Sequence, residues 1–299
     1  MKIGFVGLGA MGAPMARQLV RSGHAVRGFD VRHDALRDLV QAGGQAAASA
    51  ADAAHDAELL WLMVVSGDQA EQVLFDGGDG GAAAALPRGA IVVAACTQAP
   101  AQAMRTAERL AAMGLAMLDA PVSGGVKAAA AGTLTIMASG EAAVFDRARP
   151  VLQALGKNVF DVGRRVGLGS TAKMVNQLLC GVHIAAAAEA LHVAERAGVP
   201  LQTMIDIIAQ SAGSSWMFGD RAPRMLRDAP PVASAVDIFV KDLGIVLDQG
   251  KRMRQGLPLA SAAMQMFLAA SGLGHGAADD SQVIRAYRAL NGAAPAVDD

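Results

Sequence analysis

The sequence contains little cysteine and no excess of either charge, and each absence excludes a class of protein. Its two cysteines, Cys96 and Cys180, are far apart in a chain of 299 residues. This excludes a disulfide framework or a metal knuckle and is typical of a reducing compartment. Lysine and arginine number 26 against 27 aspartates and glutamates, so charge gives no reason to expect nucleic acid or an anionic membrane as a partner.

Long apolar runs and metal-ligand clusters are also missing. No run of about 18 uninterrupted apolar residues occurs, so we expect no transmembrane helix. Glycines at positions 4, 7, 9 and 12 interrupt the N-terminus and argue against a signal peptide. The six histidines form no cluster with carboxylates at ligand spacing, so we expect no metal site. Together these absences predict a cytoplasmic protein.

Up to about residue 163, short apolar runs alternate with amphipathic stretches. The runs predict strands at residues 2–6, 25–29, 59–65, 90–94, 115–120, 133–138 and 158–161. Between the first runs, residues 11–21 and 34–41 predict helices. Strands separated by about 10–15 residues of helical pattern are typical of βαβ units and a parallel sheet. We therefore expect an α/β Rossmann-like domain over residues 1–163.

Beyond residue 163 the pattern is helical. Residues 171–196 contain no proline and a single glycine, Gly181, and the stop signals Gly198 and Pro200 follow. Further helical patterns cover residues 201–210, 236–253, 259–268 and 282–290. A chain of this length favours two domains. We therefore expect residues 164–299 to form an all-α domain joined to the first by the long helix.

The first predicted strand leads directly into a G-x-G-x-x-G motif that opens a predicted helix. Its positions are Gly7, Leu8, Gly9, Ala10, Met11 and Gly12. Gly7 permits a tight turn, Gly9 lets backbone approach a pyrophosphate, and Gly12 lets the helix pack closely on the strand. The N–H groups and the dipole at the helix N-terminus favour an anion. Such a turn can also exist without a ligand, but its place between strand and helix favours dinucleotide binding.

Asp30 strengthens this prediction and bears on the choice of cofactor. It lies 18 residues beyond Gly12, at the end of the second predicted strand. A carboxylate there accepts a hydrogen bond from a ribose 2′-hydroxyl and repels a 2′-phosphate. Arg32, two residues later, can partly offset that repulsion. We expect NAD in preference to NADP.

A second glycine turn follows the predicted strand at 115–120. Ser123, Gly124 and Gly125 place a hydroxyl and bare backbone N–H groups before an alanine-rich helical stretch, an arrangement that suits a carboxylate. Taken alone, this segment is equally well explained as an ordinary loop.

Two lysine-containing segments of the helical half also stand out. Lys173 and Asn176 are three residues apart and so share a face of the long helix. A lysine on a helix is usually solvated, but the neighbours of Lys173 are mostly apolar. Partial burial lowers a lysine pKa and makes the side chain usable for proton transfer near neutral pH. Lys241 and Asp242 form a charged pair within another apolar helical stretch, where an exposed pair is the simpler explanation.

In combination, these motifs resemble those of the β-hydroxyacid dehydrogenase family, which includes 3-hydroxyisobutyrate dehydrogenases and tartronate semialdehyde reductases. The resemblance covers about residues 2 to 290. The matching segments, in chain order, are residues 4–12, Asp-Ala-Pro-Val-Ser-Gly-Gly at 119–125, Gly169 with Lys173-Met-Val-Asn-Gln at 173–177, and Lys-Asp-Leu-Gly at 241–244.

The resemblance implies a role for each matching residue. The family's catalytic lysine corresponds to Lys173 and its substrate-positioning asparagine to Asn176. Its turn for the substrate carboxylate corresponds to Ser123, Gly124 and Gly125. The resemblance also implies a Rossmann-like domain followed by a helical domain that binds substrate and forms dimers or tetramers. We therefore expect a small hydroxy-acid substrate and a homodimer or homotetramer.

Two further positions correspond to cofactor contacts of the family. Thr97 matches a serine or threonine that touches the cofactor, and Lys241 matches a lysine near it. The family's usual acidic residue before that serine or threonine is absent, because Ala95 and Cys96 precede Thr97 here. The contact expected from position 97 does not depend on that acid.

Residues 214–221 resemble the L-threonate dehydrogenase branch of the family, whose substrate is oxidised at its 2-hydroxyl. Trp216, Met217 and Phe218 could instead be core residues of the helical domain. 3-Hydroxyisobutyrate dehydrogenase and tartronate semialdehyde reductase are the alternative activities. A non-catalytic nucleotide-binding scaffold and an imine reductase remain as different classes, and both are disfavoured by the presence of Lys173.

Overall fold

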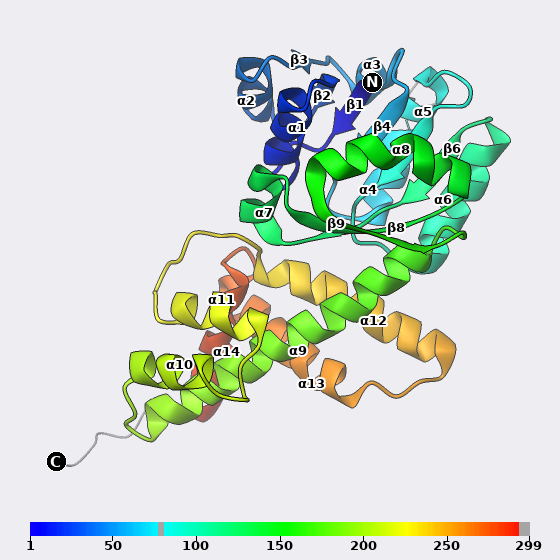
Figure 1. Cartoon of the computed structure of the whole chain (residues 1–299). Helices are drawn as coiled ribbons and strands as arrows, with labels where there is room; N and C mark the ends of the chain where they lie inside the picture. The colour runs from blue at the N-terminus through cyan, green and yellow to red at the C-terminus, as the bar shows by residue number, and fades with distance from the viewer. Residues whose placement is uncertain (77–80, 293–299) are drawn as a thin grey trace. The chain divides into compact units, whose positions relative to one another are not determined.

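The computed structural model describes residues 1–76 and 81–292. It divides into two units, Met1–Lys173 and Met174–Asp299, and most elements of both are labelled in Figure 1. The division falls inside helix α9, Leu168–Arg196, whose first residues belong to the sheet-containing unit.

The first unit is built on one sheet with the order β3-β2-β1-β4-β5-β6-β8-β7, and β9 pairs with β8. The strands are β1 Lys2–Val6, β2 Ala25–Phe29, β3 Gln45–Ala46, β4 Leu59–Leu62, β5 Ile91–Ala94, β6 Ala116–Asp119, β7 Val122–Ser123, β8 Leu134–Ser139 and β9 Gly156–Gly163. Strands β1 to β6 pair in parallel. This confirms the predicted Rossmann-like sheet, and the carboxyl ends of these strands share one edge.

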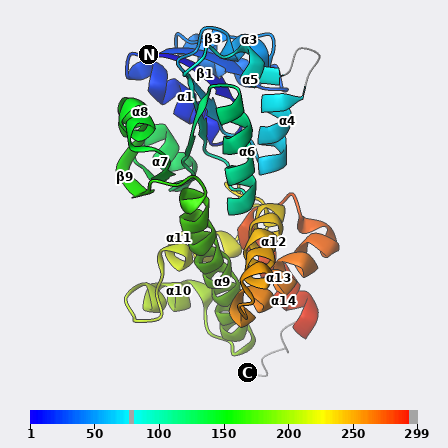
Figure 2. The ribbon, with the colours of Figure 1, turned by 90° about the vertical axis from the view of Figure 1, so that its right-hand side faces the viewer.

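Both faces of this sheet are buried, as in other parallel sheets. Strands β4 and β5 are buried at every position, and Phe5 stacks on Trp61 of the neighbouring strand with ring centroids 6.3 Å apart. One apolar cluster lies under helices α1, α2, α7 and α8, and a second under α3 to α6. Figure 2 shows α1, α7 and α8 on one side of the sheet and α4 and α6 on the other.

The helices of this unit complete the layers. They are α1 Gly12–Arg21, α2 Ala35–Gln41, α3 Ala50–Ala54, α4 Gly67–Phe75, α5 Gly81–Ala85, α6 Pro100–Ala112, α7 Gly125–Ala131 and α8 Ala142–Leu155. The last part of the sheet departs from the parallel pattern, because β8 runs antiparallel to β6 and to β7. The connection from β6 to β8 runs through β7 and α7. The two-residue strands β3 and β7 are too short to be recognised from apolar periodicity.

The second unit is helical, as predicted. It contains most of α9, then α10 Leu201–Ala209, α11 Trp216–Met225, α12 Val236–Met253, α13 Pro258–Ala270 and α14 Ile284–Asn291, with short turns of helix at Ser271–His275 and Asp280–Val283. Its core includes Ile184, Leu191, Leu243 and a stacked pair, Phe239 and Phe267, with centroids 5.1 Å apart.

Helix α9 is long and apolar enough, by length and composition alone, to cross a membrane. We expected no such helix because the sequence has no long uninterrupted apolar run. Averaged over a window, however, the mean hydropathy of α9 reaches 1.3 despite its few polar residues. Half of that window is buried within the protein. Ile184, Ala188 and Leu191 of α9 lie fully buried in the helical core, which is how a long core helix is used.

Candidate active site

The glycine motif forms the turn between β1 and α1, at the carboxyl edge of the sheet. Gly7 has φ +96°, and a Cβ there would lie 2.5 Å from the Met63 carbonyl oxygen. A Cβ on Gly12 would lie 1.8 Å from the carbonyl oxygen of Gly7, so strand and helix can approach only without it. A Cβ on Gly9 would meet nothing within 4 Å. Gly7 and Gly12 are thus required by the turn itself, while Gly9 leaves open space that suits a pyrophosphate.

Asp30 is attached to this turn. Its Oδ2 accepts a hydrogen bond of 2.7 Å from the Leu8 N–H, and its Oδ1 accepts one of 2.9 Å from the Arg32 N–H. The carboxylate is only 10% exposed, and the Arg32 guanidinium lies 3.5 Å from Oδ1. Leu8 and Asp30, which the sequence connected only through a motif, are therefore in direct contact at the place where β1 and β2 both end.

The end of β5 contributes two neighbouring polar residues. Thr97, predicted to contact the cofactor, is partly exposed just beyond the strand. The next residue, Gln98, is 2% exposed, and within the described part of the chain its Nε2 has no hydrogen-bond partner. A buried N–H donor without a partner is costly, and at a cofactor edge it can be satisfied by a bound ligand. Gln98 could not be identified from the sequence, because a single glutamine carries no motif.

The serine–glycine turn has the predicted geometry. Ser123 ends β7 opposite Thr135, and α7 begins at Gly125. Gly124 has φ +128° and Gly125 has φ +70°, conformations that favour glycine. Ser123 is partly exposed and both glycines are exposed, so the hydroxyl and the N–H groups are accessible to a carboxylate.

Helix α9 is anchored to the sheet immediately before Lys173. Asp119, at the end of β6, accepts hydrogen bonds from the N–H groups of Gly167 (3.0 Å) and Ser170 (2.7 Å) and from the Ser170 hydroxyl (2.7 Å). Ser139 of β8 accepts a further one from Gly169 N–H. These contacts satisfy donors that a helix N-terminus leaves open. Lys173 follows one turn later and is 8% exposed, as expected for a partly desolvated lysine.

Burial also perturbs the acid that forms this anchor. Asp119 is completely inaccessible, and burial raises the pKa of its carboxyl group, although the hydrogen bonds from Ser170, Gly167 and Ser139 act in the opposite direction. It lies in the segment 119–125 that the sequence analysis singled out, but its role there is visible only in three dimensions.

In the helical unit, Asn176 and Lys241 are connected through two intermediate side chains. Lys241 forms an ion pair with Asp242, which accepts a hydrogen bond of 2.6 Å from Gln177 Nε2. Asn176 Nδ2 in turn donates to Gln177 Oε1 at 3.1 Å. Two predicted site residues on different helices are therefore part of one polar chain. Asp242 is 2% exposed, so the Lys241–Asp242 pair is not the exposed pair that the simpler explanation required.

The segment at 214–221 is divided between surface and core. Trp216 is 67% exposed at the start of α11, whereas Met217 and Phe218 belong to the helical core. Arg221 is buried and donates to both carboxylate oxygens of Asp280, at 2.7 and 2.9 Å. Burial disfavours its charge, but the ion pairs with Asp280 and Asp220 outweigh this, and the pKa of Arg221 lies above its ordinary value.

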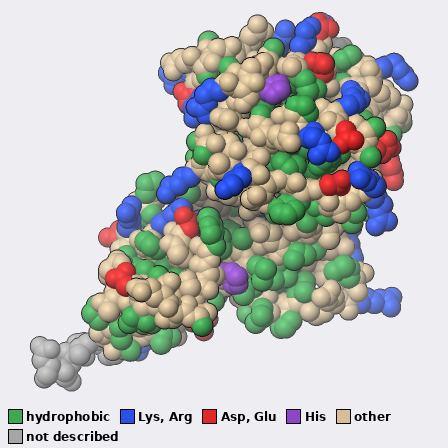
Figure 3. Space-filling view, in the orientation of Figure 1, with side chains coloured by type: hydrophobic (Ala, Val, Ile, Leu, Met, Phe, Trp, Pro, Cys, Tyr) green, Lys and Arg blue, Asp and Glu red, His purple; other side chains and the backbone are tan. Residues whose placement is uncertain are grey.

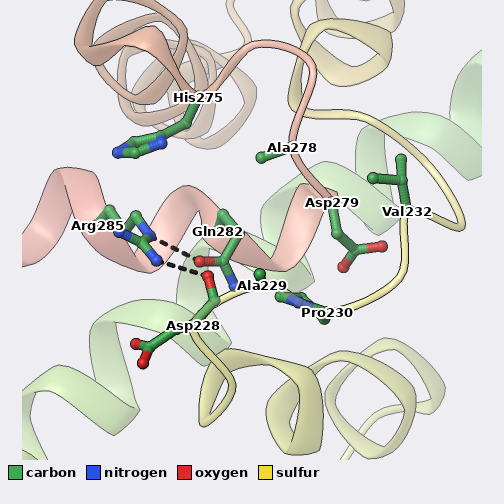
Figure 4. A pocket seen from close by; sticks show the side chains of 9 residues that line it. All are labelled: Asp228, Ala229, Pro230, Val232, His275, Ala278, Asp279, Gln282 and Arg285. Carbon is green, nitrogen blue, oxygen red and sulfur yellow. Dashed lines mark hydrogen bonds between the residues drawn. The ribbon is translucent and has the colours of Figure 1, made fainter.

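A cavity of about 250 Å³ lies near Arg221 and Asp280, and none of the predicted site residues lines it. Figure 4 shows Arg285 bonded to Gln282 and to the Asp228 carbonyl, with His275 and Asp279 on opposite sides. Within residues 1–76 and 81–292, no group of three or more histidine, cysteine, aspartate or glutamate residues could hold a metal ion.

Comparisons with known proteins match both units. Residues 2–163 match the family described as the NAD binding domain of 6-phosphogluconate dehydrogenase. Residues 167–287 match the family described as NAD-binding of NADP-dependent 3-hydroxyisobutyrate dehydrogenase. The chain is 47% identical to an L-threonate dehydrogenase of Cupriavidus necator, over 95% of each protein. It is 36% identical to a 3-hydroxyisobutyrate dehydrogenase of Pseudomonas aeruginosa, over 96% of this chain and 98% of that one.

A solved structure agrees with these matches. The crystal structure of a 3-hydroxyisobutyrate dehydrogenase from Salmonella typhimurium is 47% identical and superposes with a TM-score of 0.90, covering 95% of this chain and 98% of that one.

Proposed function

Because this chain belongs to the family of nicotinamide-dependent hydroxy-acid dehydrogenases that includes 3-hydroxyisobutyrate dehydrogenase, we propose that it oxidises L-threonate at its 2-hydroxyl carbon and transfers the hydride to NAD. The observation that carries the choice of substrate is the 47% identity, over nearly the whole chain, to a protein named as an L-threonate dehydrogenase. 3-Hydroxyisobutyrate and tartronate semialdehyde are the alternative substrates.

The residues of the first unit fit a nicotinamide dinucleotide. The space above Gly9 and the N–H groups at the start of α1 would hold the pyrophosphate, and Thr97 and Gln98 would contact the half of the cofactor nearer the reaction. Asp30 would receive the ribose 2′-hydroxyl and disfavour the 2′-phosphate of NADP. When bound, the nicotinamide ring supplies the hydride acceptor. Leu8, Ala10 and Met11 complete the turn, and Lys241 would be the cofactor contact of the helical unit.

The substrate would be held and deprotonated by side chains of this chain. The Ser123 hydroxyl and the N–H groups of Gly124 and Gly125 bind the carboxylate and orient the neighbouring carbon. Lys173, as a neutral amine, would take the hydroxyl proton, and the hydrogen on the same carbon would leave with the bonding electron pair as a hydride for the nicotinamide ring. The carbonyl product and a protonated Lys173 remain, and Asn176 holds the reacting groups in register. In this assignment residues 1–163 bind the dinucleotide and residues 164–299 complete the substrate site.

One experiment tests both substrate and mechanism. NADH formation is measured against threonate, 3-hydroxyisobutyrate, glycerate and tartronate, and the panel is repeated with NADP. We expect the highest kcat/KM with threonate and NAD. Lys173→Ala should abolish turnover while NADH still binds, and Lys157→Ala, an exposed lysine of β9, is the matched control. Faster oxidation of 3-hydroxyisobutyrate than of threonate would overturn the choice of substrate, and turnover by Lys173→Ala would overturn the mechanism.

We also propose a homodimer or homotetramer in the cytoplasm, assembled through the helical unit. On α9 the side chains of Val175, Leu179 and Val193 are 50–63% exposed, and an apolar groove of about 570 Å³ lies between α9 and α10. Figure 3 shows apolar side chains gathered on the visible face of this unit, with few charges among them. A second copy of the chain would cover such a surface. Light scattering should give a dimer or tetramer, and Val193→Glu should shift it toward monomer; a wild-type monomer would reject the proposal.

A further inference from the structure

In the polar chain of the helical unit, the chemistry of the side chains determines which group donates each hydrogen bond and which accepts it. It begins at Asp242 of α12, beside Lys241, and runs through Gln177 to Asn176 on α9. It can exist because α9 and α12 approach closely here: a Cβ on Gly181, one turn beyond Gln177, would lie 2.9 Å from the Leu243 side chain. Gln177 and Asp242 are 8% and 2% exposed, so the amide–carboxylate bond is shielded from competing water.

The carboxylate of Asp242 fixes the orientation of the amide next to it. An ionised carboxylate can only accept hydrogen bonds, so Gln177 must present its NH2 group to Asp242, at 2.6 Å. The carbonyl Oε1 of Gln177 therefore faces Asn176.

The same logic applies to the next amide. Because Gln177 presents an oxygen, Asn176 must present its NH2 group to it, at 3.1 Å. The second N–H of that group donates to the sulfur of Cys180, one helical turn further on, at 3.4 Å. Both N–H bonds of Asn176 are thus committed within the helical unit. The amide is left with Oδ1 as the atom that it can offer to a reactant.

We propose that Asp242 and Gln177 are positioning residues, which hold Asn176 with its carbonyl oxygen toward the reactants so that it acts solely as a hydrogen-bond acceptor. Its donor is the reacting hydroxyl group or the amine of Lys173, which lies three residues earlier on α9. An amide held in this way repels the substrate carboxylate, which must then bind elsewhere. This inference rests on the proposed hydroxy-acid oxidation and specifies the polarity of one of its residues.

Asp242→Asn tests the origin of the polarity. Lys241 favours the oxygen of the amide introduced at position 242, which turns the new NH2 group toward Gln177. Gln177 then reverses to accept, and Asn176 reverses to present its NH2 group to the reactants. We expect kcat with the best hydroxy acid to fall by about 10- to 100-fold, the usual effect of one mispaired buried polar group. NADH fluorescence measures cofactor binding separately, since the change also replaces the ion pair of Lys241 by a contact with a neutral amide.

The double variant D242N/Q177E provides the rescue. The carboxylate introduced at position 177 has no donor, so the amide at position 242 must donate to it and Asn176 must donate to its other oxygen. The original polarity of Asn176 returns, although the ion pair of Lys241 remains lost. We expect the double variant to recover at least about tenfold in kcat over D242N alone. A double variant as slow as D242N or slower, or a D242N that keeps the wild-type kcat, would overturn the proposal.

Position 177 gives a second test that does not require Asp242 to be changed. Q177E still accepts from Asn176 but faces the carboxylate of Asp242, so we expect a lower thermal stability and a higher kcat than those of Q177K. Q177K pairs with Asp242 but donates toward Asn176, so we expect a higher thermal stability and a kcat at least about tenfold lower than those of Q177E. Activity and thermal stability should therefore rank these variants in opposite orders, and the same order for both would contradict the inference. Wild-type protein inactive on every hydroxy acid would instead refute the underlying function.

Discussion

Ser170 donates two hydrogen bonds to Asp119, one from its N–H and one from its hydroxyl, each 2.7 Å long. They join the end of β6 to the first turn of α9, one turn before Lys173. The sheet therefore fixes the position of the first turn of α9 and, through it, the position of the proposed catalytic lysine. A change at Asp119 is expected to displace Lys173 through the helix.

Asp119→Ala should lower both stability and turnover. An alanine cannot accept from the N–H groups of Gly167 and Ser170, which leaves buried donors unsatisfied at a cost of about 1–3 kcal/mol in unfolding free energy. Urea unfolding and kcat measure the two effects. Asp146→Ala changes an exposed aspartate of α8 and should alter stability by less than about 0.5 kcal/mol. Equal stability of the two variants would show that the anchor contributes nothing.

Gly9→Ala and Gly12→Ala should separate cofactor binding from folding. A Cβ at position 9 meets nothing in the protein but enters the space proposed for the pyrophosphate. We expect unchanged thermal stability and a Kd for NADH at least about tenfold higher. A Cβ at position 12 collides with Gly7, so that variant should unfold at lower temperature. Gly9→Ala that binds NADH normally would remove the turn from the cofactor site.

Gln98→Met should weaken cofactor binding without weakening the protein. Removing a buried donor that has no partner in the described residues costs nothing in hydrogen bonding. Methionine also has a similar length, so thermal stability should be unchanged or higher. If Nε2 binds the dinucleotide, the Kd for NADH should rise by up to about tenfold. Lower stability together with normal NADH binding would assign Gln98 to the fold alone.

The Glu195–Arg288 pair of the helical unit should stabilise the protein only above acidic pH. Burial opposes ionisation of Glu195, but hydrogen bonds from Arg288 and His192 outweigh it and lower the pKa of Glu195 below its ordinary 4.5. A depressed pKa in the folded state means that the contribution is complete above 4.5 and is lost as pH falls through the folded pKa.

Arg288→Ala tests this dependence through unfolding free energies between pH 3 and pH 7. For a pair that remains partly exposed, the variant should be less stable than wild type by about 0.5–1 kcal/mol at pH 7. That difference should shrink as the pH falls through the folded pKa of Glu195. A difference that is constant over this range would mean that Arg288 stabilises the protein by packing alone.

Much of the fold could be predicted because its signals are local. A run such as Lys2–Val6 followed by glycines at 7, 9 and 12 identifies strand, turn and helix from neighbouring residues only. The antiparallel pairing of β8 with β6 could not be predicted, since the period of a strand does not state its direction. The strands β3 and β7 were missed for lack of length, because two residues show no period.

From the sequence alone we predicted the residue types of the proposed site: the glycines at 7, 9 and 12, Asp30, the turn at Ser123, and the lysines at 173 and 241. Which atoms of these segments form hydrogen bonds with one another is visible only in three dimensions. Asp30 receives the Leu8 N–H, Asp119 anchors α9, and Asp242 orients Asn176 through Gln177. The reason is physical: the direction of a hydrogen bond depends on its partner, and these partners lie 22 to 65 residues away in the chain.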